Sequence, residues 1–235
     1  MVKLVYSPQW FYGKDIIIDI ISIVVLLLIA FASLRYYKII KNRNYLFLTG
    51  SFGVLAMSFL FKVLMNINVY YKIVETKDLG VATTAYQYLK ETPNFFKHSF
   101  FLYWFSTILG FYILFSIYQK QSASNFLLGA YLLSVLTYVG YPDYHIFHAT
   151  LLVILALISL SQLRKYINKK HFATRIVALG FGLIALSQAF FVAVEYNLNF
   201  YVIGEVMQLA GYICLLITFI MVLRHGKKNE SRYNW

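Results

Sequence analysis

Residues 16–34 read IIIDIISIVVLLLIAFASL, an apolar run broken by a single acid, Asp19. A helix of about 20 such residues spans the hydrocarbon core of a bilayer, which is about 30 Å thick. A charge inside such a helix is costly, so an ionisable residue there is a functional candidate by default. This run therefore predicts a membrane fold and marks Asp19 as a first candidate site residue.

Similar runs recur along the whole chain of 235 residues, whose hydrophobic content of 60% is too high for a soluble domain of this size. No charged start, short apolar core and small-residue cleavage site precede the first run, so we expect it to be retained rather than cleaved. The sequence predicts one all-α integral membrane domain over residues 1–235, in the cell membrane. Its seven predicted spans are residues 16–34, 45–69, 95–118, 125–141, 145–163, 173–195 and 200–223.

The formal net charge of +12 does not indicate a nucleic-acid site, because the basic residues are distributed according to the predicted topology. Six lysines lie on one side of the seven-span arrangement, and Lys62 lies inside a span. Because basic residues favour the cytoplasmic side, the bias predicts an external N-terminus, a cytoplasmic C-terminus and contact with lipid headgroups. The majority, on the other side, are Arg35, Lys38, Lys41, Arg43, Lys120, Arg164, Lys165, Lys169, Lys170, Arg175, Arg224, Lys227, Lys228 and Arg232.

One segment of the chain also resembles another segment of the same chain. Residues 24–68 align without a gap with residues 153–197, and 15 of the 45 pairs are identical. Chance identity between leucine-rich helices is roughly 10%, or about four or five pairs, and three of the identical pairs lie in polar connections. We therefore predict a 3+1+3 parallel repeat with halves 1–118 and 142–223, in which the fourth span inverts the chain. The halves differ most in the predicted extracellular loop 70–94.

Ionisable residues inside or at the ends of the spans gather in the outer third of the predicted bilayer. The lysine in the second span has two possible roles: its stem reaches out to the headgroups, or it forms an ion pair with Asp19 or Glu205. The repeat places Asp19 opposite His148. The candidate outer polar pocket consists of Asp19, Lys62, His148, Glu195 and Glu205.

Histidines supply a second candidate site. His145 and His148 lie one turn apart at the start of the fifth span, and His98 begins the third. Asp143, just before the fifth span, is a suitable N-cap, and His145 suits the headgroup region without any ligand. A metal or haem would instead need all three imidazoles, because two residues at this spacing do not complete a ligand set. Both readings remain open.

Two stretches near the C-terminus carry a family resemblance. GFGLIALSQAFF (180–191) and FYVIGEVMQLAGYICLLITFIMVLR (200–224) resemble the last two helices of small archaeal seven-helix membrane proteins of unknown function. They also resemble the seven-helix sensor domains that precede histidine kinases. The resemblance covers about a quarter of the chain and implies a sensor-like module without catalytic residues. Only HGKKNESRYNW follows the last span, so we expect no output domain here.

Two other seven-helix classes fit less well. FLYWFSTILG (101–110) resembles the third helix of microbial rhodopsins, but the last span contains no lysine to form a retinal Schiff base. Transporters of the SWEET and PQ-loop type bend at prolines within helices, whereas Pro8, Pro93 and Pro142 all lie outside the spans.

The sequence thus favours a non-enzymatic multi-pass protein, either a sensor-like module or an accessory subunit. Its partners would be membrane lipid and either another protein or further copies of itself. Two alternatives stay open: a transporter of small molecules or ions that uses the outer polar residues, and a membrane protein with a histidine-bound metal or haem.

Overall fold

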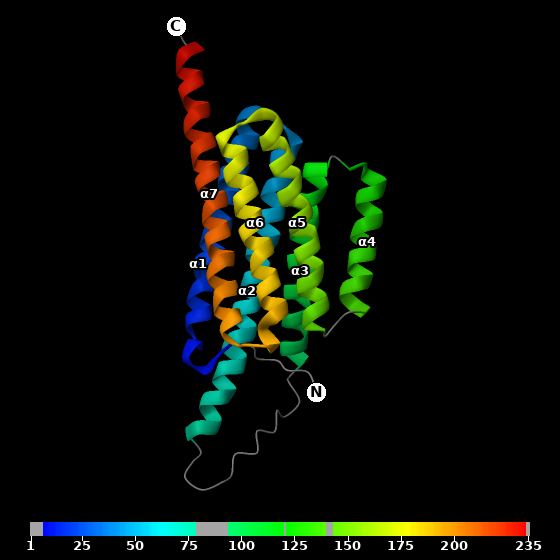
Figure 1. The fold of residues 1–235 in the computed structure, drawn as a ribbon, viewed down its shortest axis with the longest axis vertical. Coiled ribbons are helices and arrows are strands. Elements are labelled where there is room, and N and C mark those ends of the chain that lie inside the picture. Colours follow the sequence, from blue (N-terminus) through cyan, green and yellow to red (C-terminus); the bar gives the residue numbers. More distant parts are fainter. Residues whose placement is uncertain (1–6, 79–93, 120, 140–142, 234–235) are drawn as a thin grey trace.

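The computed structural model describes residues 7–78, 94–119, 121–139 and 143–233, and every regular element in these ranges is a helix (Figure 1). The predicted loop 70–94 therefore falls largely outside the described residues, as do Lys120 and Pro142. The elements are η1 (Gln9–Phe11), α1 (Lys14–Ile40), α2 (Arg43–Asp78), α3 (Asn94–Gln119), α4 (Ala123–Val139), α5 (Tyr144–Lys169), α6 (Phe172–Val192), η2 (Ala193–Glu195) and α7 (Asn199–Tyr233).

Each predicted span corresponds to one α-helix, and the expected helical membrane architecture is confirmed at this level. Six of the described helices are long and apolar enough to cross a membrane, while α4, with 17 residues, is a shorter apolar helix. Two helices extend beyond their predicted spans. Helix α2 continues to Asp78 and α7 to Tyr233, because polar residues carry on a helix once it leaves the apolar layer.

Helix α1 shows how the chain sorts its residues. Ile17, Val24 and Phe31 recur every seventh residue on the outward face and are 51–65% exposed. The opposite face buries Asp19 together with Ser22, Leu26 and Ser33. A soluble helix would point its polar residues outward, so this reversed arrangement is the one that suits a lipid environment.

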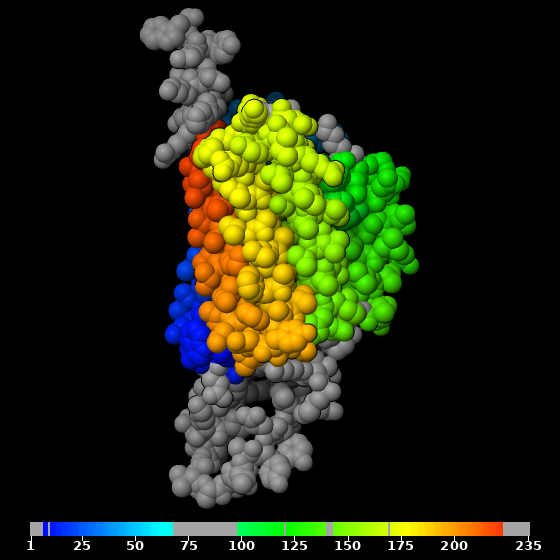
Figure 2. Space-filling model, viewed as in Figure 1, coloured from blue at the N-terminus to red at the C-terminus, as the bar shows by residue number. Residues whose placement is uncertain are grey.

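Six helices form a closed ring in the order α1, α2, α3, α5, α6, α7, with α7 returning to α1. Helix α4 stands outside the ring and packs on α3 (Figure 1). In the space-filling view, α7, α6, α5 and α4 cover one face of the molecule side by side (Figure 2). The ring places the starts of α1 and α7 at the same end, beside the end of the apolar part of α2.

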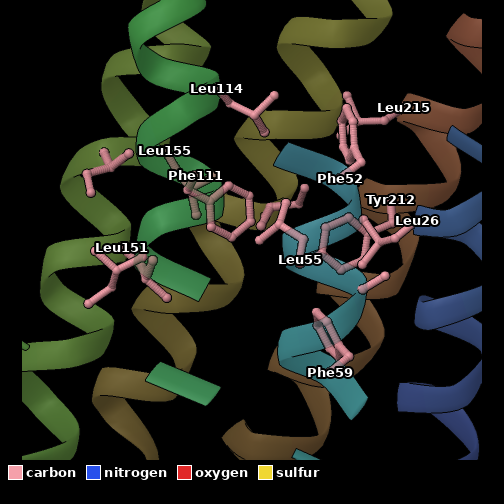
Figure 3. Packing of buried hydrophobic residues seen from close by; sticks show 14 of the residues in the cluster. Leu26, Phe52, Leu55, Phe59, Phe111, Leu114, Leu151, Leu155, Tyr212 and Leu215 are labelled. Carbon is pink, nitrogen blue, oxygen red and sulfur yellow. The ribbon is translucent and has the colours of Figure 1, made fainter. Parts of the chain in front are cut away.

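One apolar core fills the ring. Its fully buried side chains come from all six helices of the ring and include aromatic rings that meet across the centre, such as Phe59 and Tyr212, whose ring centres are 5.6 Å apart. Figure 3 shows Phe52, Leu55 and Phe59 of α2 in the centre of this cluster, between residues of the neighbouring helices. Burial of such rings stabilises helix association in lipid through close packing rather than through exclusion of water.

Candidate functional site

The buried faces of three helices each bring one ionisable side chain to the same place. On α2, Phe52, Leu55, Phe59 and Lys62 lie on one face because they are three or four residues apart. Glu205 lies on the buried face of α7 in the same way, and Asp19 on that of α1. Helical periodicity alone therefore directs all three side chains into the ring.

Lys62 lies between the two acids. Its Nζ donates to Asp19 Oδ1 at 2.8 Å and to Glu205 Oε1 at 2.6 Å. The side chains of Lys62, Asp19 and Glu205 are 6%, 0% and 1% exposed, so water reaches almost none of this cluster. We refer to Asp19, Lys62 and Glu205 as the ion cluster. Both ion pairs considered at the sequence level are present at once, and the lysine does not extend to the headgroups.

The ion cluster has a further, mainly polar shell. Asn66, one turn after Lys62, donates to Asp19 Oδ2 at 3.5 Å, a long contact. The Lys62 ammonium lies 5.5 Å from the centre of the Phe59 ring, close enough for a cation–π contact. Tyr103 of α3 and Tyr201 of α7 lie within electrostatic reach of Lys62.

Such a cluster holds its helices together only while it stays complete. Two charges taken out of water cost several kcal/mol each, and their mutual attraction offsets this cost only when the geometry is good and the hydrogen bonds are made. Here the cluster contains two carboxylates and one ammonium, so the full set of ionised groups carries an excess negative charge. The ion cluster is thus an energetically expensive feature, and the two pairs at 2.6 and 2.8 Å join α2 to both α1 and α7.

A second, smaller cluster of buried aromatic and aliphatic side chains lies at the end of the bundle nearer to the ion cluster. This cluster, which we call the cap, consists of Phe11, Phe191, Val194 and Tyr201, all at most 8% exposed. Gly13 adopts a φ of 82°, a left-handed conformation that glycine takes without strain, in the turn between η1 and α1. The turn allows Phe11 of η1 to fold back and meet Tyr201 edge-on, with ring centres 6.5 Å apart.

The five predicted pocket residues do not form one group. His148 lies in a separate contact between α5 and α6, where Nδ1 donates to Gln188 Oε1 at 2.7 Å. Its ring packs 4.8 Å from Phe191, which belongs to the cap. Glu195, 55% exposed, pairs with Nε2 of His145 at 3.1 Å on the surface. The structure therefore joins Asp19, Lys62 and Glu205 by direct contacts, whereas His148 bonds to Gln188 and Glu195 to His145.

The three histidines of the predicted metal or haem site have different surroundings. His98 is exposed at the start of α3, His145 faces Glu195, and His148 faces Gln188. Within the described residues, no three His, Cys, Asp or Glu side chains gather closely enough to hold a metal ion. The predicted N-cap is confirmed, since Asp143 Oδ1 accepts from the backbone of His145 at 2.9 Å and of Ile146 at 3.3 Å.

Several neighbours of the ion cluster were not singled out from the sequence. Tyr201 precedes Glu205 by one turn on the same helix face, a spacing that would have revealed it. Asn66 follows Lys62 at the same spacing. Tyr103 carries no such signal, because its approach to Lys62 depends on how α3 is rotated beside α2. Comparison with protein-family models, with curated proteins and with solved structures found no match for this chain.

Proposed function

We propose that this protein is a non-enzymatic, sensor-like module of the cell membrane that signals or assembles through a partner. The multi-pass helical architecture provides the frame for this role. The observation that carries the proposal is the buried bridge from Lys62 to Asp19 and Glu205. A charged contact between three helices has two packing states, complete and broken, and so can couple a local chemical event to helix arrangement.

The position of the bridge supports this role. Helices α1, α2 and α3 pack in chain order, as do α5, α6 and α7, and the two sets meet where α1 contacts α7 and where α3 contacts α5. Asp19 and Glu205 lie on the two helices of the first junction, and Lys62 holds both. A change in the ion cluster would therefore act directly on the contact between the two halves of the ring.

We infer that these halves are the two copies of a 3+1+3 parallel repeat. The C-terminal ends of two helices support this repeat. Helices α1 and α5 are each followed by a lysine in the left-handed conformation, Lys41 at φ 55° and Lys170 at φ 52°. These residues are equivalent in the internal alignment. So are Ser58 and Ser187, whose hydroxyls donate to the carbonyl oxygens of Leu55 and Ile184, again an aligned pair.

Close helix contacts also support the repeat. A Cβ added at Gly110 of α3 would meet the side chain of Leu55 and the carbonyl oxygen of Ser51 on α2. A Cβ added at Gly211 of α7 would meet the equivalent Ile184 and Gly180 on α6. Each copy thus uses a glycine of its third helix against matching positions of its second helix.

The ion cluster breaks this symmetry. The internal alignment pairs Asp19 with His148 and Lys62 with Phe191, and in the second half the corresponding contact is aromatic, at 4.8 Å. The first half has an ion pair at this position and the second half an aromatic contact. This difference indicates that only one copy has kept, or gained, charged side chains here. Unequal halves suit a sensor, in which one site biases a common frame.

Orientation completes the proposal. The described basic residues Arg35, Lys38, Arg164 and Arg175 lie near the end of the bundle opposite the ion cluster, which supports a cytoplasmic position for that end. The ion cluster would then lie near the external surface, where a sensor meets its stimulus.

Transport of a small ion is a second candidate, favoured by the unequal numbers of acids and lysines in the ion cluster. Flux through proteoliposomes tests it with the double variant Asp19→Asn/Glu205→Gln. Flux through the wild type that is lost in the double variant would favour transport. No flux through the wild type, or equal flux through both proteins, would remove this candidate.

The sensor proposal is tested by purification from native membranes in a mild detergent, with chemical cross-linking before extraction. We expect wild type and the surface variant Glu195→Gln to retain a stoichiometric partner or a second copy of the chain, and Lys62→Met to retain less of it. A protein that is recovered alone in all three cases, and whose thermal unfolding responds to no added ligand, would contradict the proposal.

A further inference from the structure

We propose that the ion cluster is a binding site for one exchangeable proton, in addition to the proton that the Lys62 ammonium itself carries. The inference deepens the proposed sensor role by naming its stimulus and rests on that role only for its physiological meaning. Proton binding itself follows from the composition and burial of Asp19, Lys62 and Glu205.

Charge balance is the first argument. With all three groups ionised, two carboxylates and one ammonium carry a net charge of −1 in a place where side-chain exposure is 6% or less. An uncompensated charge in a medium of low dielectric constant is strongly disfavoured, and an ionisable group there takes up or releases a proton instead. One proton on either carboxylate makes the cluster neutral while both oxygen contacts to Lys62 remain possible.

Among the described residues, Lys62 is the cation in contact with Asp19 and Glu205, and no second lysine or arginine forms an ion pair with either acid. Helix α1 adds a further acid, Asp15, one turn before Asp19 and 1% exposed. Helix α3 contributes the hydroxyl of Tyr103, and α7 that of Tyr201. Helices α5 and α6 contribute His148, which lies within electrostatic reach of Lys62, and its amide partner Gln188, whose Oε1 accepts from the imidazole Nδ1. The exposed pair His145–Glu195 lies at the junction of α5 and η2.

The position of the ion cluster gives the proton a route. Asp19 and Glu205 lie about 8–9 Å from the first residues of α1 and α7, at a rise of about 1.5 Å per residue. Among the described residues, the buried apolar side chains at that end of the bundle are those of the cap, Phe11, Phe191, Val194 and Tyr201. On the other side lies the apolar core, which extends through the ring to the opposite end. Exchange with water is therefore expected through the cap, where Phe11 of the short helix η1 is the most easily displaced member.

Proton release would also change helix contacts. The neutral cluster satisfies Lys62 with one carboxylate and one hydrogen-bonded acid, whereas the deprotonated cluster keeps an excess negative charge between α1 and α7. That repulsion acts at the junction of the two halves, so loss of the proton favours a looser contact there. This is the coupling that the sensor role requires, with the proton as ligand.

Infrared spectroscopy of the full-length protein in lipid vesicles tests the inference, because a buried protonated carboxyl group has its own C=O stretching band that shifts in D₂O. We expect one such band at neutral pH in wild type. It should disappear in Asp19→Asn and in Glu205→Gln, since each leaves one carboxylate against one ammonium. Glu195→Gln, which removes an exposed acid, should keep it. Circular dichroism and size-exclusion chromatography check that each variant is folded.

Three results would overturn the inference: no protonated carboxyl band in the wild type, a band that survives both Asp19→Asn and Glu205→Gln, or a band lost only in Asp15→Asn. A further variant tests the route, since Phe11→Ala should shorten the time in which D₂O shifts the band, while Trp10→Ala, at an exposed position beside it, should not. Because none of these readouts involves a partner, the proton site and the sensor role can fail independently.

Discussion

Lys62 is the residue on which the proposed site depends most. Its ammonium contacts two acids from two other helices, and neither acid is more than 1% exposed. Removing one partner of a buried ion pair leaves the other uncompensated, at a cost of about 3–5 kcal/mol. Lysine at this position is therefore required by its neighbours, whatever the protein does.

We expect Lys62→Met to lower the free energy of unfolding in detergent by about 3–5 kcal/mol, because the two buried acids then lose the cation that both of them contact. Thermal or denaturant unfolding followed by circular dichroism measures the loss. Glu195→Gln, which removes a half-exposed partner of His145, is the matched control and should cost no more than about 1 kcal/mol. Equal stability of the two variants would show that Lys62 is not buried as described.

Gln188 offers a second test at the residue scale. It accepts from His148 at 2.7 Å, and both side chains are at most 4% exposed. Gln188→Leu leaves the imidazole Nδ1 without this acceptor, so we expect a loss of about 1–3 kcal/mol in the free energy of unfolding. The double variant Gln188→Leu/His148→Phe removes both polar groups and should recover part of that loss. If the loss of stability in the double variant equals the sum of the losses in Gln188→Leu and His148→Phe, the two side chains are not in contact.

Helices α6 and α7 approach each other closely at two glycines, Gly180 and Gly211. A Cβ on Gly211 would lie 2.8 Å from the carbonyl oxygen of Gly180, on the facing helix backbone. Gly50 of α2, by contrast, has nothing within 4 Å of its added Cβ. Because alanine favours a helix over glycine by up to about 1 kcal/mol, Gly50→Ala should be neutral or stabilising.

We expect Gly211→Ala to lower stability by about 1–3 kcal/mol, since backbone on the neighbouring helix cannot move aside cheaply. Unfolding in detergent compares it with Gly50→Ala. If both substitutions stabilise the protein, α6 and α7 do not meet as described.

The start of α5 gives another element-scale prediction. Asp143 Oδ1 accepts two backbone N–H groups there, at 2.9 and 3.3 Å. Asp143→Ala should cost about 0.5–2 kcal/mol, and Asp143→Asn, which keeps an accepting oxygen, should cost less. The order of the two midpoints of thermal unfolding tests this, and the reverse order would contradict the cap.

The sequence predicted the elements better than it predicted their contacts. Long apolar runs are enough to locate the seven helices. The high energetic cost of a charged side chain in lipid is enough to mark Asp19, Lys62 and Glu205 as candidates. Which side chains these three residues contact depends on how each helix is rotated and on the order of the helices in the ring. The hydropathy of the spans contains no information on either. Glu195 was grouped with them because it lies at a similar depth, yet η2 turns it to the surface, where it is 55% exposed.

At the scale of the molecule, two sets of three helices close into a ring with α4 outside it (Figure 1). The proposed topology places the start of α1 outside the cell. Single cysteines introduced after replacement of Cys214 test it in intact cells with an impermeant thiol reagent. We expect labelling of a cysteine at position 10, where Trp10 is 58% exposed, and none at position 170 between α5 and α6 until the cells are opened. The opposite pattern would reverse the topology.

The central physical idea is that Asp19, Lys62 and Glu205 act as one energetic unit across three helices. Unfolding of Lys62→Met compared with the triple variant Lys62→Met/Asp19→Asn/Glu205→Gln tests this most directly, because the triple variant removes every charge and leaves side chains of similar size. We predict that the triple variant recovers most of the stability lost in Lys62→Met. A triple variant that is less stable than Lys62→Met would contradict the account, because the three side chains would then contribute separately.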